Sequence, residues 1–187
     1  MISSNDLRNG MTIVFEGEVH IVHEFQHVKS ANRRAVVQVK LKNLATGSVF
    51  DHKFQGREPL ELAVLDKKEM QYLYRDKNLY CFMDPETSEQ VSIEQSKIEH
   101  ILGYLKEDST VNFTWYKDEP VEISLPDFIV LRVTQALPGV RGDTVSGGSK
   151  PVTLESGKEI QVPLFINEGD LIRIDTRIGR YIERVKE

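Results

Sequence analysis

Short runs in which apolar and polar residues alternate dominate this sequence, and they exclude long helices over most of it. From Val37 to Lys42, within VVQVKLKNL, every second residue is apolar. A period of two is typical of a strand with one buried face. DLIRIDTRIGRYIERV (170–185) repeats the habit around a turn near residues 177–179, and MQYLYRDKNLYCFMD (70–84) predicts two aromatic-rich strands around a turn at 76–78. Many short strands at this spacing predict an all-β fold of small barrels or sandwiches.

One segment, SIEQSKIEHILGYLK (92–106), breaks the alternation and predicts a short helix. Ser92 is a good N-cap residue, and Gln95 stands at the capping-box position. Apolar residues then recur at helical spacing, at Ile98, Ile101, Leu102 and Leu105.

Composition places the chain among ordinary soluble proteins. It has 187 residues, of which 40% are hydrophobic and 28% charged, and its length predicts one or two domains. The single cysteine, Cys81, excludes an internal disulfide. The first residues do not read as a signal peptide, and no run reaches the roughly 18 apolar residues that cross a bilayer. We therefore expect a cytoplasmic protein with no membrane partner.

Charge is unevenly distributed along the chain, which is net −5 overall. Plausible domain joints lie near residues 64 and 128, and the three segments that they define carry net charges of +1, −7 and +1. Such a chain could bind a polyanion at both ends while its acidic middle segment is repelled. The alternative is a solvated acidic surface with no role beyond solubility.

A cluster of cations lies in the first segment. No Asp or Glu occurs between Glu24 and Asp51, and this gap contains Lys29, Arg33, Arg34, Lys40 and Lys42. The flanking strand patterns predict a hairpin with residues 30–34 at its tip. Guanidinium groups at a tip suit phosphate, and lysines on one face behind them would support RNA binding. The alternative is a hairpin whose charges only keep a sheet edge soluble.

Catalytic chemistry is not indicated. His20, His23 and His27 resemble a metal cluster, but residues three apart on a strand face opposite sides, so we expect no metal. The stretch GDTVSGGSKP (142–151) lacks the order of a phosphate-binding loop, and strand-like sequence follows it where such a loop needs a helix. Its glycines suit either close approach to an RNA backbone or an ordinary hairpin loop. We expect no enzyme and no cofactor.

Several stretches resemble the bacterial elongation factor P family over nearly the whole length. They are MISSNDLRNGMTI (1–13), FQHVK (25–29) with VKLKNLATG (39–47) beyond the tip, FMDPETSEQ (82–90), and above all the long run from PGVRGD (138–143) to YIERV (181–185). The resemblance implies three β-barrels: an SH3-like, KOW-type domain at 1–64 and OB-folds at 65–127 and 128–187, with one short helix in the middle domain.

The resemblance also implies a function. Family members bind the ribosome between the peptidyl-tRNA and exit sites and stimulate peptide bond formation, which relieves stalls at consecutive prolines. The implied partners are the ribosome, peptidyl-tRNA and rRNA, and the expected state is a monomer. The alternatives are a divergent elongation factor P-like paralogue and a general RNA-binding OB protein without stall relief.

Two loops carry the implied contacts. The hairpin tip would approach the CCA end of the tRNA, and it comprises Lys29, Ser30, Ala31, Asn32, Arg33 and Arg34. The C-terminal loop would face the ribosome and mRNA, and it comprises Gly142, Asp143, Thr144, Ser146, Gly147 and Gly148.

The tip departs from the family pattern. The usual family tip reads Pro-Gly-Lys-Gly, and its Lys is often modified; some members have a modified Arg at this position, where this chain has Asn32. Arg33 could take over the reaching role, modified or bare; the tip could work unmodified; or the chain could be a paralogue with another stall preference. We favour Arg33, the candidate modified residue, because an arginine can reach phosphate without extension.

Overall fold

A computed structural model describes residues 1–28, 36–136 and 148–186 of the chain. The described elements are almost all strands, with one short α-helix, so the predicted all-β class is confirmed. The contacts between Cα atoms divide the chain into two compact units. One comprises Met1–Lys68 with Phe113–Ile123, and the other comprises Glu69–Asn112 with Ser124–Glu187.

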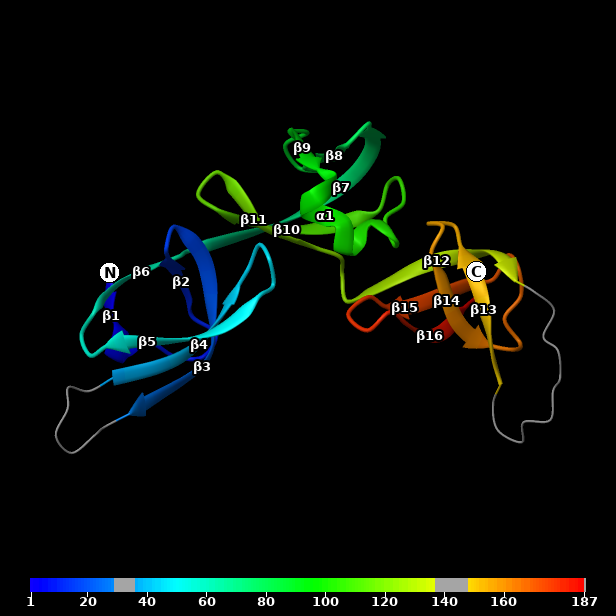
Figure 1. Ribbon diagram of the computed structural model, residues 1–187. Helices are drawn as coiled ribbons and strands as arrows, with labels where there is room; N and C mark the ends of the chain where they lie inside the picture. Colours follow the sequence, from blue (N-terminus) through cyan, green and yellow to red (C-terminus); the bar gives the residue numbers. More distant parts are fainter. Residues whose placement is uncertain (29–35, 137–147, 187) are drawn as a thin grey trace. The chain divides into compact units, whose positions relative to one another are not determined.

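The first sheet has six strands in the order β1-β6-β2-β3-β4-β5 (Figure 1). Strict alternation on β4 buries Val37, Val39 and Leu41 and leaves the residues between them more exposed, as predicted. These side chains pack with Leu7, Ile13, Val22, Phe54 and Leu60 in a continuous core. The elements of this part are β1 (Ile2–Ser3), a 3-10 turn (Ser4–Asp6), β2 (Thr12–Phe15), β3 (Glu18–Val28), β4 (Val36–Asn43), β5 (Val49–Gln55) and β6 (Pro59–Leu62).

The second sheet has five strands in the order β11-β10-β7-β8-β9. The two aromatic-rich strands predicted around residues 76–78 are confirmed as β7 and β8, and Lys77 adopts a positive φ of 53° in the turn between them. The elements are β7 (Leu65–Asp76), β8 (Leu79–Met83), β9 (Gln90–Glu94), α1 (Gln95–Leu102), β10 (Thr110–Tyr116) and β11 (Glu119–Ser124).

The predicted helix exists, but its predicted capping box is wrong. Helix α1 begins at Gln95, and its N-cap residue is Glu94, whose side chain makes no capping hydrogen bond. Ser92 instead belongs to β9, where it pairs with Cys81. Strand pairing therefore holds this segment extended up to Glu94, and the backbone carbonyl of Asn78 accepts the first helical N–H at 2.8 Å. Ile98 and Ile101 are buried, as their spacing predicts.

The third sheet has the order β14-β13-β12-β15-β16, and β14 also lies against β16, which curls the sheet toward a barrel. Its core consists of branched aliphatic side chains, which include Leu131, Val152, Ile172 and Ile174. The elements are β12 (Phe128–Ala136), β13 (Ser149–Leu154), β14 (Glu159–Pro163), β15 (Leu171–Asp175) and β16 (Arg180–Val185). The hairpin predicted around residues 177–179 is thus confirmed as β15–β16. No described helix has the length and apolar content required to cross a membrane.

Candidate nucleic-acid interface

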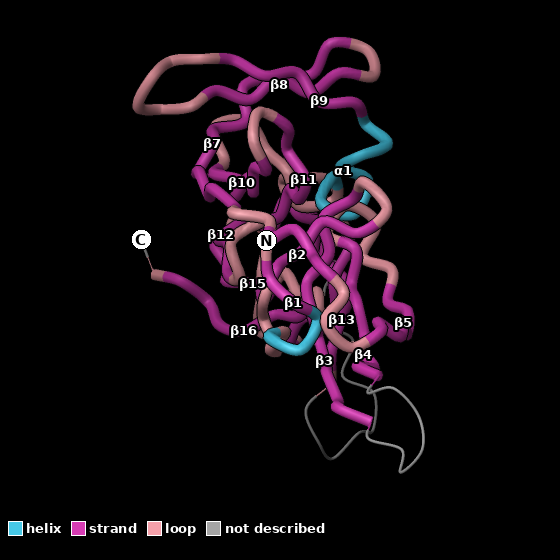
Figure 2. Tube along the Cα trace, turned by 90° about the vertical axis from the view of Figure 1, so that its left-hand side faces the viewer, coloured by secondary structure: helices cyan, strands magenta, loops and turns pink. Residues whose placement is uncertain are grey.

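The β3–β4 hairpin runs along the core of the first sheet, and we call it the arm. Figure 2 shows the two strands side by side, and their antiparallel pairing extends from His20 opposite Asn43 to Val28 opposite Val36. Residues 26–28 at the outer end of β3 are exposed. The predicted tip residues Lys29, Ser30, Ala31, Asn32, Arg33 and Arg34 lie outside the described residues. The ladder therefore persists up to both edges of the segment that contains them.

The outer face of the arm carries the lysines of the described cationic gap. The register places Lys40 between Glu24 and Asp51, and it places Lys42 between Ile21 and Val49. The Lys40 Nζ atom lies 3.3 Å from Glu24 Oε2, and both side chains are exposed to solvent. An exposed pair of this kind is screened and can exchange partners. Lys42 forms no ion pair with another described residue, so its charge stays available to an anion.

A buried polar network anchors the base of the arm, and the sequence analysis missed it. Asn43 and His20 face each other across the hairpin, and each is only 3% exposed. Asn43 Nδ2 donates to Glu18 Oε2 and lies 3.4 Å from His20 Nε2, while His20 Nδ1 lies 3.0 Å from the Glu18 carbonyl oxygen. The carbonyl requires a proton on Nδ1, so Nε2 accepts from Asn43.

The same asparagine shapes the turn that follows β4. Its Oδ1 atom accepts the backbone N–H groups of Ala45 and Thr46, each at 2.9 Å. Asparagine followed by a glycine-containing turn is a recognisable signal in the sequence NLATG, residues 43–47. The turn could have been found from the sequence, whereas the contact with His20 depends on strand register.

A β-bulge interrupts the ladder between Val22 and Glu24. It shifts the alternation by one residue, so that Val22 on one side and Phe25 on the other both face the core. His23, at the bulge, is exposed. The exposed His27 ring contacts the Phe25 ring, with centroids 5.3 Å apart. The three histidines of the apparent cluster thus have different surroundings.

The second predicted contact loop is described only at its end. Gly142, Asp143, Thr144, Ser146 and Gly147 lie outside the described residues. Gly148 is close to Leu164, because a Cβ atom at this glycine would stand 3.0 Å from Leu164 Cδ1. The chain then enters β13 directly at Ser149, which confirms the predicted strand where a phosphate-binding loop would need a helix.

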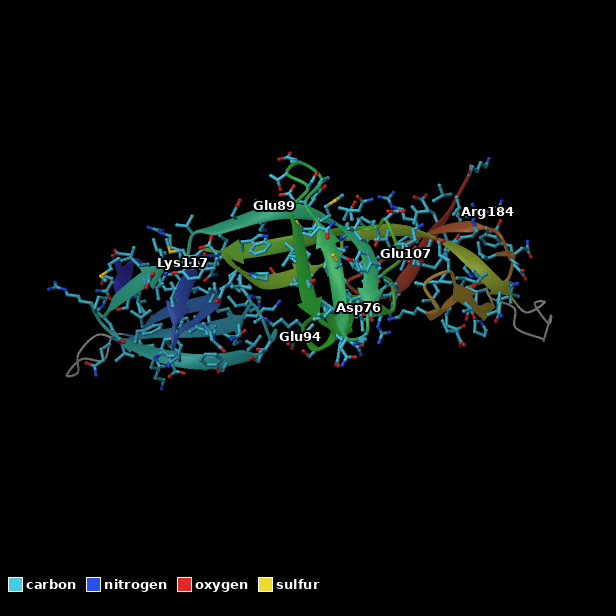
Figure 3. The ribbon with its side chains drawn as sticks, turned by 90° about the horizontal axis from the view of Figure 1, so that it is seen from above. Asp76, Glu89, Glu94, Glu107, Lys117 and Arg184 are labelled. Carbon is cyan, nitrogen blue, oxygen red and sulfur yellow. The ribbon has the colours of Figure 1, made fainter. Side chains whose placement is uncertain are left out.

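Acidic side chains are exposed on the elements of residues 65–127. Figure 3 labels Asp76, Glu89, Glu94 and Glu107, all of which are exposed on this stretch. This part of the chain has the net charge of −7 noted above. Like charges in that number disfavour the approach of a polyanion to these elements.

These features define a class: an all-β protein of small curled sheets with a cationic hairpin arm, similar in fold to known translation factors. A solved structure described as eukaryotic translation initiation factor 5A from Methanococcus jannaschii matches with a TM-score of 0.51 and 14% identity, over 67% of this chain and 90% of that one. A translation initiation factor eIF-5A family protein from Naegleria fowleri gives a TM-score of 0.51 and 13% identity, over 66% of this chain and 96% of that one. At such identities the likeness concerns the fold alone.

Family models and relatives then identify the family. Models described as the elongation factor P KOW-like domain, OB domain and C-terminal region match residues 3–60, 65–123 and 121–184. An elongation factor P from Thermoanaerobacter sp. is 50% identical over 99% of this chain and 100% of its own length. One from Natranaerobius thermophilus is 46% identical over 100% of this chain and 99% of its own. The chain belongs to the elongation factor P family of translation elongation factors.

Proposed function

We propose that this chain binds the ribosome between the peptidyl-tRNA and exit sites and stimulates peptide bond formation at consecutive prolines. The observation that carries the proposal is full-length similarity to elongation factor P, with identity of 50% over 99% of the chain. A cationic hairpin arm on a rigid base adds a physical reason, since tRNA and rRNA are polyanions. In this role the chain is a monomeric cytoplasmic factor.

The arm would deliver the tip to the CCA end of the peptidyl-tRNA. Its base is fixed by the buried network of His20 and Asn43, so the base need not become ordered on binding. Arg33 is the tip residue that we expect to reach the tRNA, because Asn32 occupies the usual acceptor position and cannot supply a cation. Lys40 and Lys42 would support it by meeting phosphates along the arm.

The mechanism is one of orientation. Proline has a fixed φ and is a constrained nucleophile, so a displaced peptidyl-tRNA loses the geometry needed for attack. Restoring that geometry can recover several kcal/mol of the barrier. The factor then supplies no acid, base or metal, because the ribosome itself performs the reaction.

The other end of the chain would contact the small subunit. We propose domains at 1–64, 65–127 and 128–187, with the loop of Gly142, Asp143, Thr144, Ser146, Gly147 and Gly148 directed toward the exit-site codon and rRNA. The acidic residues of the middle domain would face away from RNA, which is consistent with their exposure.

A translation assay on a Pro-Pro-Pro template tests the proposal. Adding the chain should shorten the pause, and Arg33→Ala should impair this far more than Lys53→Ala, which removes an exposed charge from β5. No relief by the native chain, beside relief by an ordinary family member, would refute stall relief and favour a paralogue or a general RNA-binding protein. Equal, small effects of the two variants would show that Arg33 is not the effector.

Modification of the tip is tested separately by intact-mass measurement. Protein from its native host should have a mass above that of the sequence if Arg33 is modified, and a digest of the same protein should show the increment on the peptide with Arg33. A mass equal to that of the sequence, allowing for removal of the first methionine, would exclude covalent modification of the tip.

A further inference from the structure

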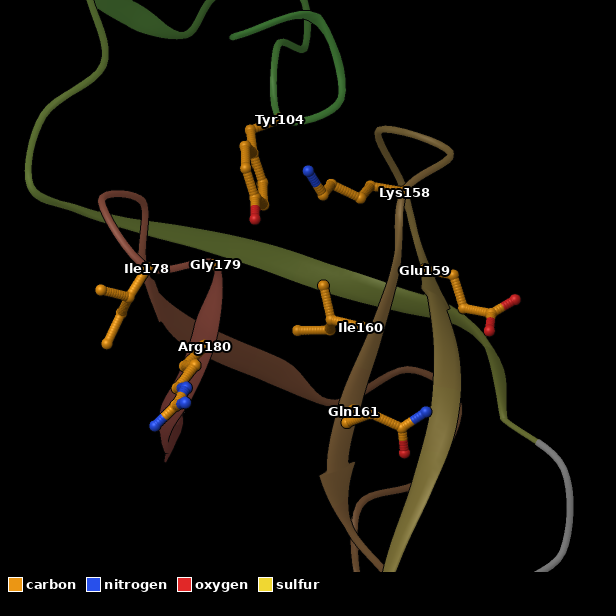
Figure 4. Close-up of a pocket in the computed structure, with 8 residues that line it drawn as sticks. All are labelled: Tyr104, Lys158, Glu159, Ile160, Gln161, Ile178, Gly179 and Arg180. Atoms are coloured by element: carbon orange, nitrogen blue, oxygen red, sulfur yellow. The ribbon is translucent and has the colours of Figure 1, made fainter. Parts of the chain in front are cut away.

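The segment that follows α1 contacts two turns of the third sheet, all within the second compact unit. Ser156 Oγ donates a hydrogen bond of 2.7 Å to the Gly103 carbonyl, and Lys106 Nζ lies 3.0 Å from Glu155 Oε1. Lys158 Nζ lies 4.1 Å from the centre of the Tyr104 ring. Figure 4 shows this ring with Lys158 on one side and the turn of Gly179 on the other. We call this set of contacts the Tyr104 joint.

The joint requires glycine at position 179. Gly179 has a φ of +63°, and a Cβ atom there would stand 2.6 Å from the Tyr104 hydroxyl oxygen, which is closer than any real contact. The next ring atom, Cζ, would be 4.0 Å away, an ordinary contact distance. Of the neighbouring atoms, only the hydroxyl oxygen would clash with a Cβ atom here, in addition to the strain that the positive φ imposes on any larger residue. Elsewhere in the same sheet, Gly169 has a φ of +89° with nothing within 4 Å of its missing Cβ.

The ring is the largest apolar group at this contact. Tyr104 is only 5% exposed, and Lys158 and the turn of Gly179 both lie against its side chain. Tyr104 lines an open pocket of about 500 Å³ together with Ile160, Ile178 and Arg180, among others (Figure 4). This space is not filled by protein, and the other side-chain contacts of the Tyr104 joint between the two parts are polar: the Ser156 hydrogen bond and the Lys106 ion pair.

We propose that Tyr104 is a positioning residue. Its side chain packs against Gly179 and Lys158, and this contact makes the α1 region and the third sheet move as one body. The consequence for stall relief rests on the function proposed above. A factor that engages RNA through segments far apart in its chain binds more tightly when those segments are held at a fixed spacing. A loose joint would weaken binding without changing the reaction once the factor is bound.

Gly179→Ala tests the joint, with Gly169→Ala as its matched control. Both place a side chain at a positive φ, but only the first meets the Tyr104 hydroxyl. We expect faster amide hydrogen exchange at residues 103–106 and 177–180 in Gly179→Ala alone. In the Pro-Pro-Pro assay we expect the factor concentration for half-maximal relief to rise about tenfold, with the maximal rate unchanged. Adding Tyr104→Phe should restore much of both, because it removes only the colliding oxygen.

The outcomes separate the joint from the proposed function. Equal exchange in the two glycine variants, or no rescue by Tyr104→Phe, would overturn the joint. A fall in maximal rate at an unchanged half-maximal concentration would overturn the positioning role. If the native chain relieves no stall, the proposed function fails, and the exchange measurements still decide whether the joint exists.

Discussion

Replacing Asn43 by alanine should destabilise the first compact unit by about 3 kcal/mol. The change removes the partner of four groups: the N–H groups of Ala45 and Thr46, each bound at 2.9 Å, the Nε2 atom of His20, and Oε2 of Glu18. Ala45 and Thr46 are exposed, so water replaces part of the loss at their two N–H groups. Each lost hydrogen bond costs about 1 kcal/mol, and a buried group left unpaired costs at least that. The sum is a large share of the roughly 5–15 kcal/mol by which domains are stable.

Urea unfolding followed by tryptophan fluorescence measures this loss. Trp115 is the only tryptophan and belongs to the same compact unit as the arm. With a slope of about 2 kcal/mol per molar urea, the midpoint should fall by roughly 1–2 M. Thr46→Ala is the control, because it removes an exposed hydroxyl that forms hydrogen bonds only within the turn. This change should lower the free energy of unfolding by less than about 1 kcal/mol. A loss below about 1 kcal/mol in Asn43→Ala would show that the network does not anchor the arm.

Three further predictions concern stability. Phe54→Ala removes a side chain with 0% exposure and should cost about 3–5 kcal/mol by urea unfolding, whereas Phe50→Ala, at 37% exposure, should cost clearly less; equal losses would contradict the assigned core. Lys40→Ala should change stability by less than about 1 kcal/mol, because its pair with Glu24 is exposed, and a larger loss would mean that the pair is structural. Burial would raise the pKa of Glu155, but the Arg132 N–H and Lys106 outweigh it and lower the pKa below the ordinary 4.5. The stabilisation is therefore present above pH 4.5 and lost as the pH falls through the lower pKa of the folded state. The difference in unfolding free energy between the native chain and Glu155→Gln, measured in urea, should shrink on acidification. A difference that stays constant with pH would contradict this.

Local pattern was sufficient for much of the fold. The alternation on β4 and the hairpins β7–β8 and β15–β16 follow from residues that are neighbours in the chain. The capping box at Ser92 failed because pairing with β8, which is not a local effect, keeps that residue in a strand. Local helix and capping propensity is overridden where a strand from elsewhere in the fold forms hydrogen bonds with the same backbone groups.

The parts of the candidate site that pattern could not supply depend on register and on distant contacts. His20 and Asn43 meet only because the hairpin pairs them, and the bulge at His23 shifts the alternation beyond it. Tyr104 and Gly179 lie in separate elements, and nothing in either local sequence indicates their contact. Residues 29–34 of the tip remain a prediction from the sequence and its resemblance to the family.

The bulge on β3 affects the direction of the arm without affecting which of its side chains are exposed. A ladder without the extra residue would still present Glu24 and Gln26 outward, since Val22 and Glu24 keep their partners Leu41 and Lys40. What the extra residue adds is local twist, and twist determines where the end of the arm points. The direction of the arm can therefore change while the same side chains stay exposed. A relative that gained or lost one residue at this bulge would point the arm elsewhere and still present the same polar face to solvent.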